Sequence, residues 1–162
     1  MSVQITAITI QRSTKPKDAP AALLVRDRET ALRDLKSAET FNIIKDDNGP
    51  YALDLSIDEN RLVFRITNAE REELPMLVLS LKPYARLIKD YFMIVRSYDD
   101  AIREGKPSRI EAIDMGRRGL HNEGAALLAE RLEDKIAMDM DTARRLFTLI
   151  CVLHEDRIVT KR

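Results

Sequence analysis

The sequence predicts an α+β fold, in which an antiparallel sheet of about four to six strands packs against a long central helix and a C-terminal helical layer. Two observations indicate this class. Residues 51–66 alternate apolar and polar side chains with a period of two, which is typical of strands. Residues 84–104 repeat apolar side chains every three or four positions, which is typical of a helix with one buried face. Elements of these two kinds bury their apolar faces against each other in layers.

The first part of the chain predicts a strand, a loop and a helix. Residues 3–10 are β-branched and largely alternate, so we expect a strand. Residues 12–20 are polar, and Pro20 closes this predicted loop at a helix start. Residues 21–38 predict an amphipathic helix, with Arg26 among the charges off its apolar face. The predicted apolar face consists of Leu24, Ala31, Leu32, Leu35 and Ala38.

A run of predicted strands follows. It begins at residues 41–45, and Asn48-Gly49-Pro50 then turns the chain into residues 51–57. Residues 62–66 and 76–81 complete the run. Strands joined by short turns form an antiparallel meander with one face on the core. The residues expected on that face are Tyr51, Leu53, Leu55, Ile57, Leu62, Phe64 and Ile66.

Helical patterns dominate the second half of the chain. Residues 84–104 predict the longest helix and the centre of the core. Ser108 is expected to cap the next helix, with Glu111 three residues later as its capping-box partner. That helix runs into residues 114–124 and continues as residues 125–134.

The C-terminal part predicts a short edge strand over residues 135–141 and a last helix over residues 142–154, capped by Asp141. Asp139 and Asp141 resemble half of a metal site, but capping and solvation explain this pair better, and we expect no metal or cofactor. Cys151 falls within an apolar helix and is expected to be an inert core residue.

Bulk properties limit the classes of function. We expect residues 1–162 to form a single domain, with a charged tail at residues 155–162. Lysine plus arginine equals aspartate plus glutamate at 27 each, which favours neither nucleic acid nor an anionic membrane as a partner. A single cysteine excludes an internal disulfide. The sequence shows no signal-peptide pattern and no apolar run long enough to span a membrane, so we expect a cytoplasmic protein.

Residues 114–124 are the most unusual stretch, because they hold three of the five glycines and one of the two histidines. On a helix, Asp114, Arg117, Arg118 and His121 share one face. Two guanidiniums beside an imidazole are suited to binding phosphate or carboxylate. The full set of candidate ligand-binding residues is Asp114, Arg117, Arg118, His121, Asn122, Glu123, Arg144 and Arg145.

The glycines leave the local structure open. Each glycine costs a helix about 1 kcal/mol relative to alanine, so the segment is either a continuous helix or a turn between two helices. In a continuous helix, a stripe of mostly small residues would let another backbone approach closely. That stripe consists of Ala112, Gly116, Gly119, Glu123 and Ala126.

Several stretches resemble the signature of a small alphaproteobacterial family of uncharacterised proteins. They are Asn48-Gly49-Pro50-Tyr51, residues 60–64 (NRLVF), residues 89–94 (KDYFMI), residues 110–124 (IEAIDMGRRGLHNEG) and residues 141–149 (DTARRLFTL). The resemblance implies a bacterial cytoplasmic protein of unknown function. It assigns no catalytic residue.

Two hypotheses follow. The first is a non-enzymatic regulatory or adaptor protein that binds an anionic small molecule or an acidic partner segment through residues 114–124. The alternative is a small phosphate-directed enzyme, in which His121 acts as acid/base or phospho-acceptor and Arg117 and Arg118 clamp the phosphoryl group. The sequence lacks the phosphate-binding, dinucleotide and zinc-protease motifs, which weakens the second hypothesis. A homodimer is left open.

Overall fold

A computed structural model describes residues 3–11 and 21–154, so the predicted loop at residues 12–20 and the predicted tail at residues 155–162 lie outside the described residues. The α+β class is confirmed. The elements in chain order are β1 (Ile5–Ile10), α1 (Ala22–Leu35), β2 (Phe41–Ile43), β3 (Tyr51–Asp58), β4 (Arg61–Thr67), β5 (Leu77–Ser80), the 3-10 turn η1 (Lys82–Tyr84), α2 (Ala85–Glu104), α3 (Pro107–Leu132), β6 (Ile136–Met138) and α4 (Met140–Leu153).

The main sheet contains four strands within the described residues, in the order β1-β3-β4-β5. The predicted antiparallel meander is present in β3, β4 and β5. The expectation of a wholly antiparallel sheet is wrong at β1, which pairs with β3 in parallel. The reason is the connection between these two strands, because it contains α1, and parallel neighbours require such a long crossover.

Strand β2 does not begin the meander as predicted. It pairs with β6 in a separate two-stranded antiparallel sheet, so the short strand predicted at residues 135–141 is confirmed over residues 136–138 but does not extend the main sheet. Phe41 of β2 is buried, and its ring packs edge-on against Tyr51 of β3 with 6.0 Å between centroids. This contact joins the small sheet to the core.

The buried face of the meander agrees with the alternation in the sequence. Leu53 lies opposite Ile66 and Leu55 opposite Phe64, and all four side chains are buried. Ile57, at the end of β3, is half-buried.

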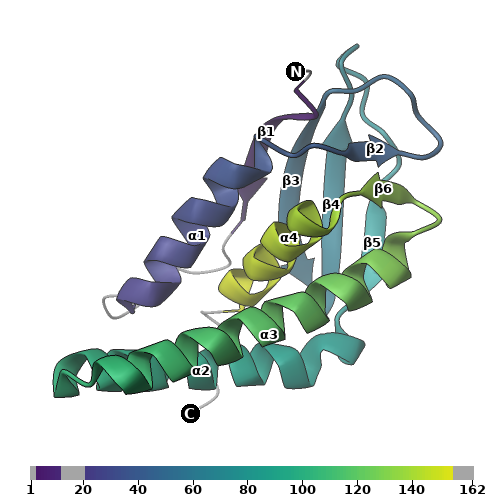
Figure 1. Ribbon diagram of the computed structural model, residues 1–162. Coiled ribbons are helices and arrows are strands. Elements are labelled where there is room, and N and C mark those ends of the chain that lie inside the picture. The colour runs from purple at the N-terminus through teal and green to yellow at the C-terminus, as the bar shows by residue number, and fades with distance from the viewer. Residues whose placement is uncertain (1–2, 12–20, 155–162) are drawn as a thin grey trace.

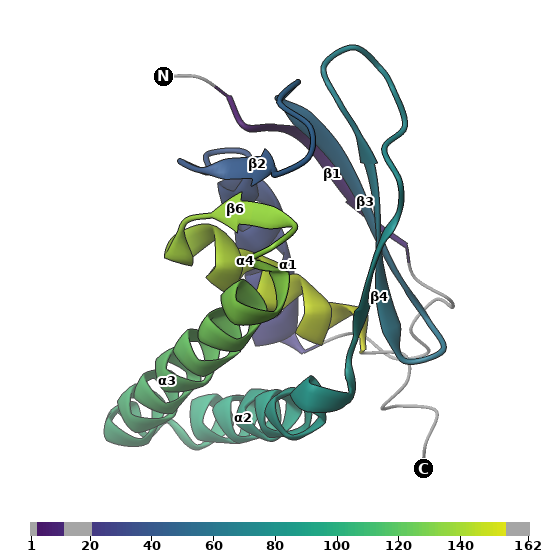
Figure 2. The same ribbon diagram turned by 90° about the vertical axis from the view of Figure 1, so that its right-hand side faces the viewer.

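All four described helices lie on one side of the main sheet (Figures 1 and 2). The predicted centre of the core, residues 84–104, is α2, but the central helix is α4, in which ten of 14 residues are buried. Helix α4 packs between α1 and α3, and α2 packs on α3. The longest helix is also not α2, with 20 residues, but α3, with 26.

Helix α3 is continuous through its three glycines, which settles the open alternative between helix and turn. A Cβ at Gly116 or Gly119 would meet no described atom within 4 Å, so the predicted close approach along the small-residue stripe is wrong for these two positions. Gly124, which is not part of that stripe, is the glycine that packs closely, against Phe147 of α4.

Both predicted helix caps are wrong by two residues. Helix α3 has Lys106 as N-cap in place of Ser108, because Pro107 has a fixed φ suited to the first helical position. Helix α4 begins at Met140, and its N-cap is Asp139, whose carboxylate accepts a hydrogen bond from the Thr142 amide at 3.2 Å. Asp141 lies in the first helical turn instead.

Candidate functional site

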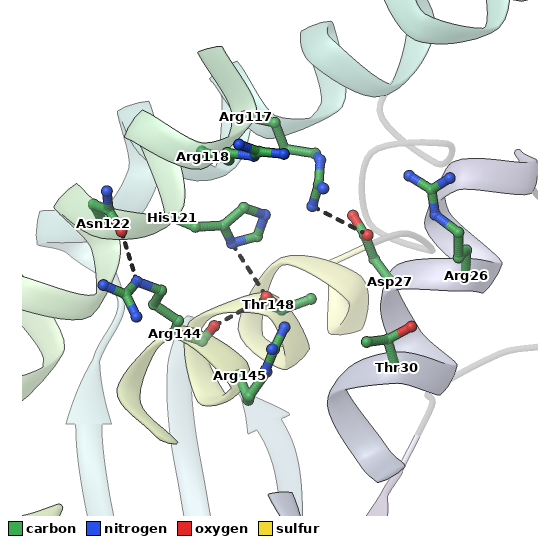
Figure 3. A pocket seen from close by; sticks show the side chains of 10 residues that line it. All are labelled: Arg26, Asp27, Thr30, Arg117, Arg118, His121, Asn122, Arg144, Arg145 and Thr148. Atoms are coloured by element: carbon green, nitrogen blue, oxygen red, sulfur yellow. Dashed lines mark hydrogen bonds and ion pairs between the residues drawn. The ribbon is translucent and has the colours of Figure 1, made fainter. Parts of the chain in front are cut away.

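A pocket of about 490 Å³ lies where α1, α3 and α4 meet, and we refer to it as the arginine pocket (Figure 3). Among the described residues, five arginines and one carboxylate line it. The lining residues are Arg26, Asp27 and Thr30 of α1, Arg117, Arg118, His121 and Asn122 of α3, and Arg144, Arg145 and Thr148 of α4.

Six of the eight predicted ligand-binding residues line this pocket: Arg117, Arg118, His121, Asn122, Arg144 and Arg145. Asp114 lies beside it and pairs with Arg117 at 3.0 Å and with Arg118 at 3.1 Å. Glu123 points away, because it pairs with Arg86 of α2. The structure therefore brings the two predicted arginine pairs together across α3 and α4, and leaves Glu123 outside.

Arg117 is held by a buried network. Its guanidinium lies 3.3 Å from Asp27 of α1, and the Tyr91 hydroxyl donates a hydrogen bond to the same carboxylate at 2.9 Å. Burial raises the pKa of Asp27, while the positive charge of Arg117 opposes that change. A buried carboxylate needs such partners, so the first task of Arg117 is structural.

The other arginines are less constrained. Arg118 has a side chain that is 73% exposed, and Arg145, which pairs with Asp34 at 3.2 Å, is 41% exposed. Arg26 lies over the ring of Tyr98, with its guanidinium carbon 5.5 Å from the centroid. Exposed ion pairs contribute little free energy, so these guanidiniums can turn toward an anion at small cost.

Arg144 is positioned by two neighbours. Its Nε donates a hydrogen bond to the Asn122 side chain at 2.6 Å, and its guanidinium pairs with Asp141 one turn earlier in α4. Asn122 thus links α3 to α4 at the rim of the pocket, and it holds Arg144 beside the lining residues of α3 (Figure 3).

His121 lines the pocket and is only 6% exposed. Its ring packs edge-on against Tyr91 and Phe147, with centroid distances of 5.8 and 5.7 Å. Nδ1 lies 3.1 Å from the Thr148 hydroxyl, whereas Nε2 is buried without a hydrogen-bond partner among the described residues. Burial lowers the pKa of His121 to about 4, and the positive charges of Arg117, Arg145 and Arg144 act in the same direction. The imidazole is therefore neutral at pH 7.

Four lining residues were missed by the sequence analysis: Arg26, Asp27, Thr30 and Thr148. Asp27 carried a usable signal, because it is spaced three and four residues from Leu24 and Ala31 on the apolar face of the first helix. A carboxylate at a buried helical position requires a cationic or donor partner. Thr148 similarly interrupts the apolar face of the last helix, while Arg26 and Thr30 carry no comparable signal.

Other candidate features have structural explanations. Cys151 is fully buried, and burial raises its pKa, as expected for an inert core thiol. Within residues 3–11 and 21–154, no group of three or more histidine, cysteine, aspartate or glutamate side chains is arranged to hold a metal ion. None of the described helices combines the length and apolar character that crossing a membrane demands.

Comparison with known proteins gives the family. A family model described as an uncharacterised protein family, UPF0262, matches residues 2–156. The UPF0262 protein of Hyphomonas neptunium is 50% identical over 151 residues, which cover 93% of this chain and 92% of the relative. The UPF0262 protein of Brucella anthropi is 55% identical, over 79% of this chain and 81% of the relative. That of Rhodospirillum rubrum is 56% identical, over 79% of both chains. No solved structure matches.

Proposed function

The chain belongs to the uncharacterised protein family UPF0262, and we propose that it is a non-enzymatic regulatory or adaptor protein that binds an anionic small molecule in the arginine pocket. The observation that carries this proposal is the composition of the pocket. Five arginines and one carboxylate line it among the described residues, although the chain as a whole carries no net charge.

Excess positive charge in a concave site attracts anions. Asp27 is already paired with Arg117, so the remaining positive charge of the lining comes from Arg26, Arg118, Arg144 and Arg145. The last three also form ion pairs with carboxylates that do not line the pocket: Asp114, Asp141 and Asp34. Guanidiniums donate paired hydrogen bonds that match phosphate and carboxylate groups. A volume of about 490 Å³ lies within the range of small-molecule sites. These features support a small anionic ligand over an acidic protein segment, which needs a longer groove.

The state of His121 favours binding over catalysis. A general base is most effective when its pKa is near the working pH, and that of His121 is lowered to about 4. Its Nδ1 contacts the Thr148 hydroxyl, and no described carboxylate orients the ring as in a catalytic triad.

A phosphate-directed enzyme is the second candidate. One observation favours it: the unpartnered Nε2 of His121 is a neutral nucleophile beside several arginines. Phosphorylation of this nitrogen by a phosphodonor, detected by mass spectrometry on wild type and lost in His121→Asn, would support the enzyme and count against a purely binding role.

A thermal-shift panel tests the main proposal. The compounds are inorganic phosphate, pyrophosphate, nucleotides and di- and tricarboxylates, at constant ionic strength. A ligand at 100 times its Kd stabilises the folded state by about 2.7 kcal/mol, which raises Tm by several degrees. The double variant Arg144→Gln/Arg145→Gln should lose this shift.

Arg61→Gln serves as the matched control, because Arg61 lies on β4 and is an exposed arginine paired with Glu59. It should retain the full shift. Absence of any shift in wild type across the whole panel, or equal shifts in the double variant and wild type, would refute anion binding in the arginine pocket.

A further inference from the structure

We infer that the arginine pocket prefers an oxyanion that keeps a proton at neutral pH, such as phosphate, over sulfate, which keeps none, and that His121 Nε2 accepts that proton in a hydrogen bond. This inference rests on the proposed function, because it specifies the anion that the same pocket binds. It follows from the protonation state of one buried ring and from the hydrogen bonds around it.

The tautomer of His121 follows from Thr148. A hydroxyl has one proton to donate, and that of Thr148 is donated to the backbone carbonyl of Arg144 at 2.9 Å. Toward His121, 3.1 Å away, the Thr148 oxygen must therefore accept, so Nδ1 carries the ring proton. In a neutral imidazole the second nitrogen is then an acceptor. Nε2 accordingly has a lone pair and no proton.

This lone pair has no partner among the described residues, although Nε2 is buried. Buried polar atoms are normally hydrogen-bonded, so a missing partner calls for an explanation. Tyr91 and Phe147 flank the ring. Figure 3 shows the second ring nitrogen on the side that faces Arg117, whose Nε is also buried and unpartnered among the described residues.

A hydroxyl group of a ligand suits both atoms chemically, because it has one proton to donate and lone pairs to accept a hydrogen bond. It can donate its proton to His121 Nε2 and accept a hydrogen bond from the Arg117 Nε. Other acceptors that line the pocket already have donors: the Asp27 carboxylate accepts from Arg117 and Tyr91, and the Asn122 oxygen accepts from Arg144. His121 Nε2 is the buried acceptor of the lining that has no hydrogen-bond partner among the described residues.

Phosphate and sulfate differ in whether they carry a hydroxyl group that can donate to Nε2. At about pH 8 inorganic phosphate is mainly a dianion, so it equals sulfate in charge and shape but retains one P–OH group. Sulfate would place an oxygen lone pair against the lone pair of Nε2, so that Nε2 would stay without a donor. Sites built to hydrogen-bond a ligand hydroxyl reject the analogue that lacks it, so we expect phosphate to bind at least about tenfold more tightly than sulfate.

The experiment is a calorimetric titration of the full chain at about pH 8 with inorganic phosphate, arsenate and sulfate, with chloride adjusted to constant ionic strength. Arsenate, which also retains a proton, should bind like phosphate, and sulfate at least about tenfold more weakly. His121→Phe keeps an aromatic ring between Tyr91 and Phe147 but removes both nitrogens. It should bring the phosphate-to-sulfate ratio close to one.

Thr148→Val provides an independent variant, because it has nearly the same shape and removes the hydroxyl that fixes the tautomer. It should lower the ratio without abolishing sulfate binding, and it carries the test if His121→Phe does not fold. Equal affinity for phosphate and sulfate in wild type, or a ratio unchanged in folded variants, would overturn this inference and leave anion binding standing. Binding of carboxylates alone would overturn it as well, whereas absence of binding by any anion would overturn the proposed function too.

Discussion

A Cβ atom added at Gly124 of α3 would lie 2.5 Å from Cγ of the Phe147 ring in α4, so the two helices cross at this point with no room for a side chain. Gly124→Ala must therefore displace Phe147 or α4. Overpacking of this kind costs about 1–3 kcal/mol. Urea unfolding should show that loss in the free energy of unfolding.

Gly116→Ala and Gly119→Ala are the matched controls in the same helix. A Cβ at either position meets no described atom within 4 Å, so alanine should stabilise the helix by about 0.5–1 kcal/mol. A loss of stability in these two variants would indicate a contact with another molecule that the single chain does not show.

Replacing Arg117 by methionine should lower the free energy of unfolding far more than replacing Arg118. Arg117→Met leaves the buried Asp27 carboxylate without its cation, and we expect a loss of about 2–4 kcal/mol in the free energy of unfolding. Arg118→Met removes only an exposed pair with Asp114 and should change stability by less than about 0.5 kcal/mol. Chemical denaturation of both variants checks this, and equal losses would contradict the assignment of Arg117 to the buried network.

His121 should make stability depend on pH. Its pKa is about 4 in the folded protein, compared with an ordinary value of 6.5 for histidine, so between these values the unfolded chain binds more protons. The free energy of unfolding therefore falls as pH is lowered from about 6.5 toward 4, by up to about 3 kcal/mol. The measurement is urea unfolding at several pH values in wild type and His121→Phe.

The difference between the two proteins isolates the histidine, because Asp27, whose pKa is raised by burial, titrates in both. Wild type should lose stability relative to His121→Phe as pH falls through this window. Parallel pH profiles would mean that the imidazole is not buried in its neutral form.

Asp139 and Asp141 offer a test of the cap of α4. Asp139→Ala removes the acceptor for the Thr142 amide and should lower the free energy of unfolding by about 1 kcal/mol. Asp141→Ala removes a first-turn charge and an exposed pair with Arg144, and should cost no more than about 0.5 kcal/mol. Thermal unfolding of both variants measures the difference, and the reverse order would restore Asp141 as the cap.

The sequence predicted those features that depend on local periodicity. The alternation at residues 51–66 gave the buried face of β3 and β4, and the three/four spacing gave α1, α2 and α4, whereas the middle of α3 was left open between a helix and a turn. The same spacing placed Arg117, Arg118 and His121 on one face of α3, where all three line the pocket. These predictions succeeded because side-chain direction follows directly from backbone geometry.

Features that depend on distant parts of the chain were not predictable in this way. Strand β1 pairs in parallel with β3, although tens of residues separate them in the sequence. The ion pair between Asp27 and Arg117 likewise joins distant segments. The glycines of residues 114–124 suggested a close helix contact, and one exists, but it is at Gly124 and not at Gly116 or Gly119. Local spacing does not show which face of α3 meets α4.

Amide NMR titration shows residue by residue where an anion binds, and so decides whether it binds in the arginine pocket. Inorganic phosphate and citrate are added separately to labelled protein at constant ionic strength. We expect the largest chemical-shift changes in residues 26–30, 117–122 and 144–148, which converge on the pocket, and none on β4 and β5. If neither anion shifts these amides in the folded protein, or if the changes map to another surface, the arginine pocket is not an anion site.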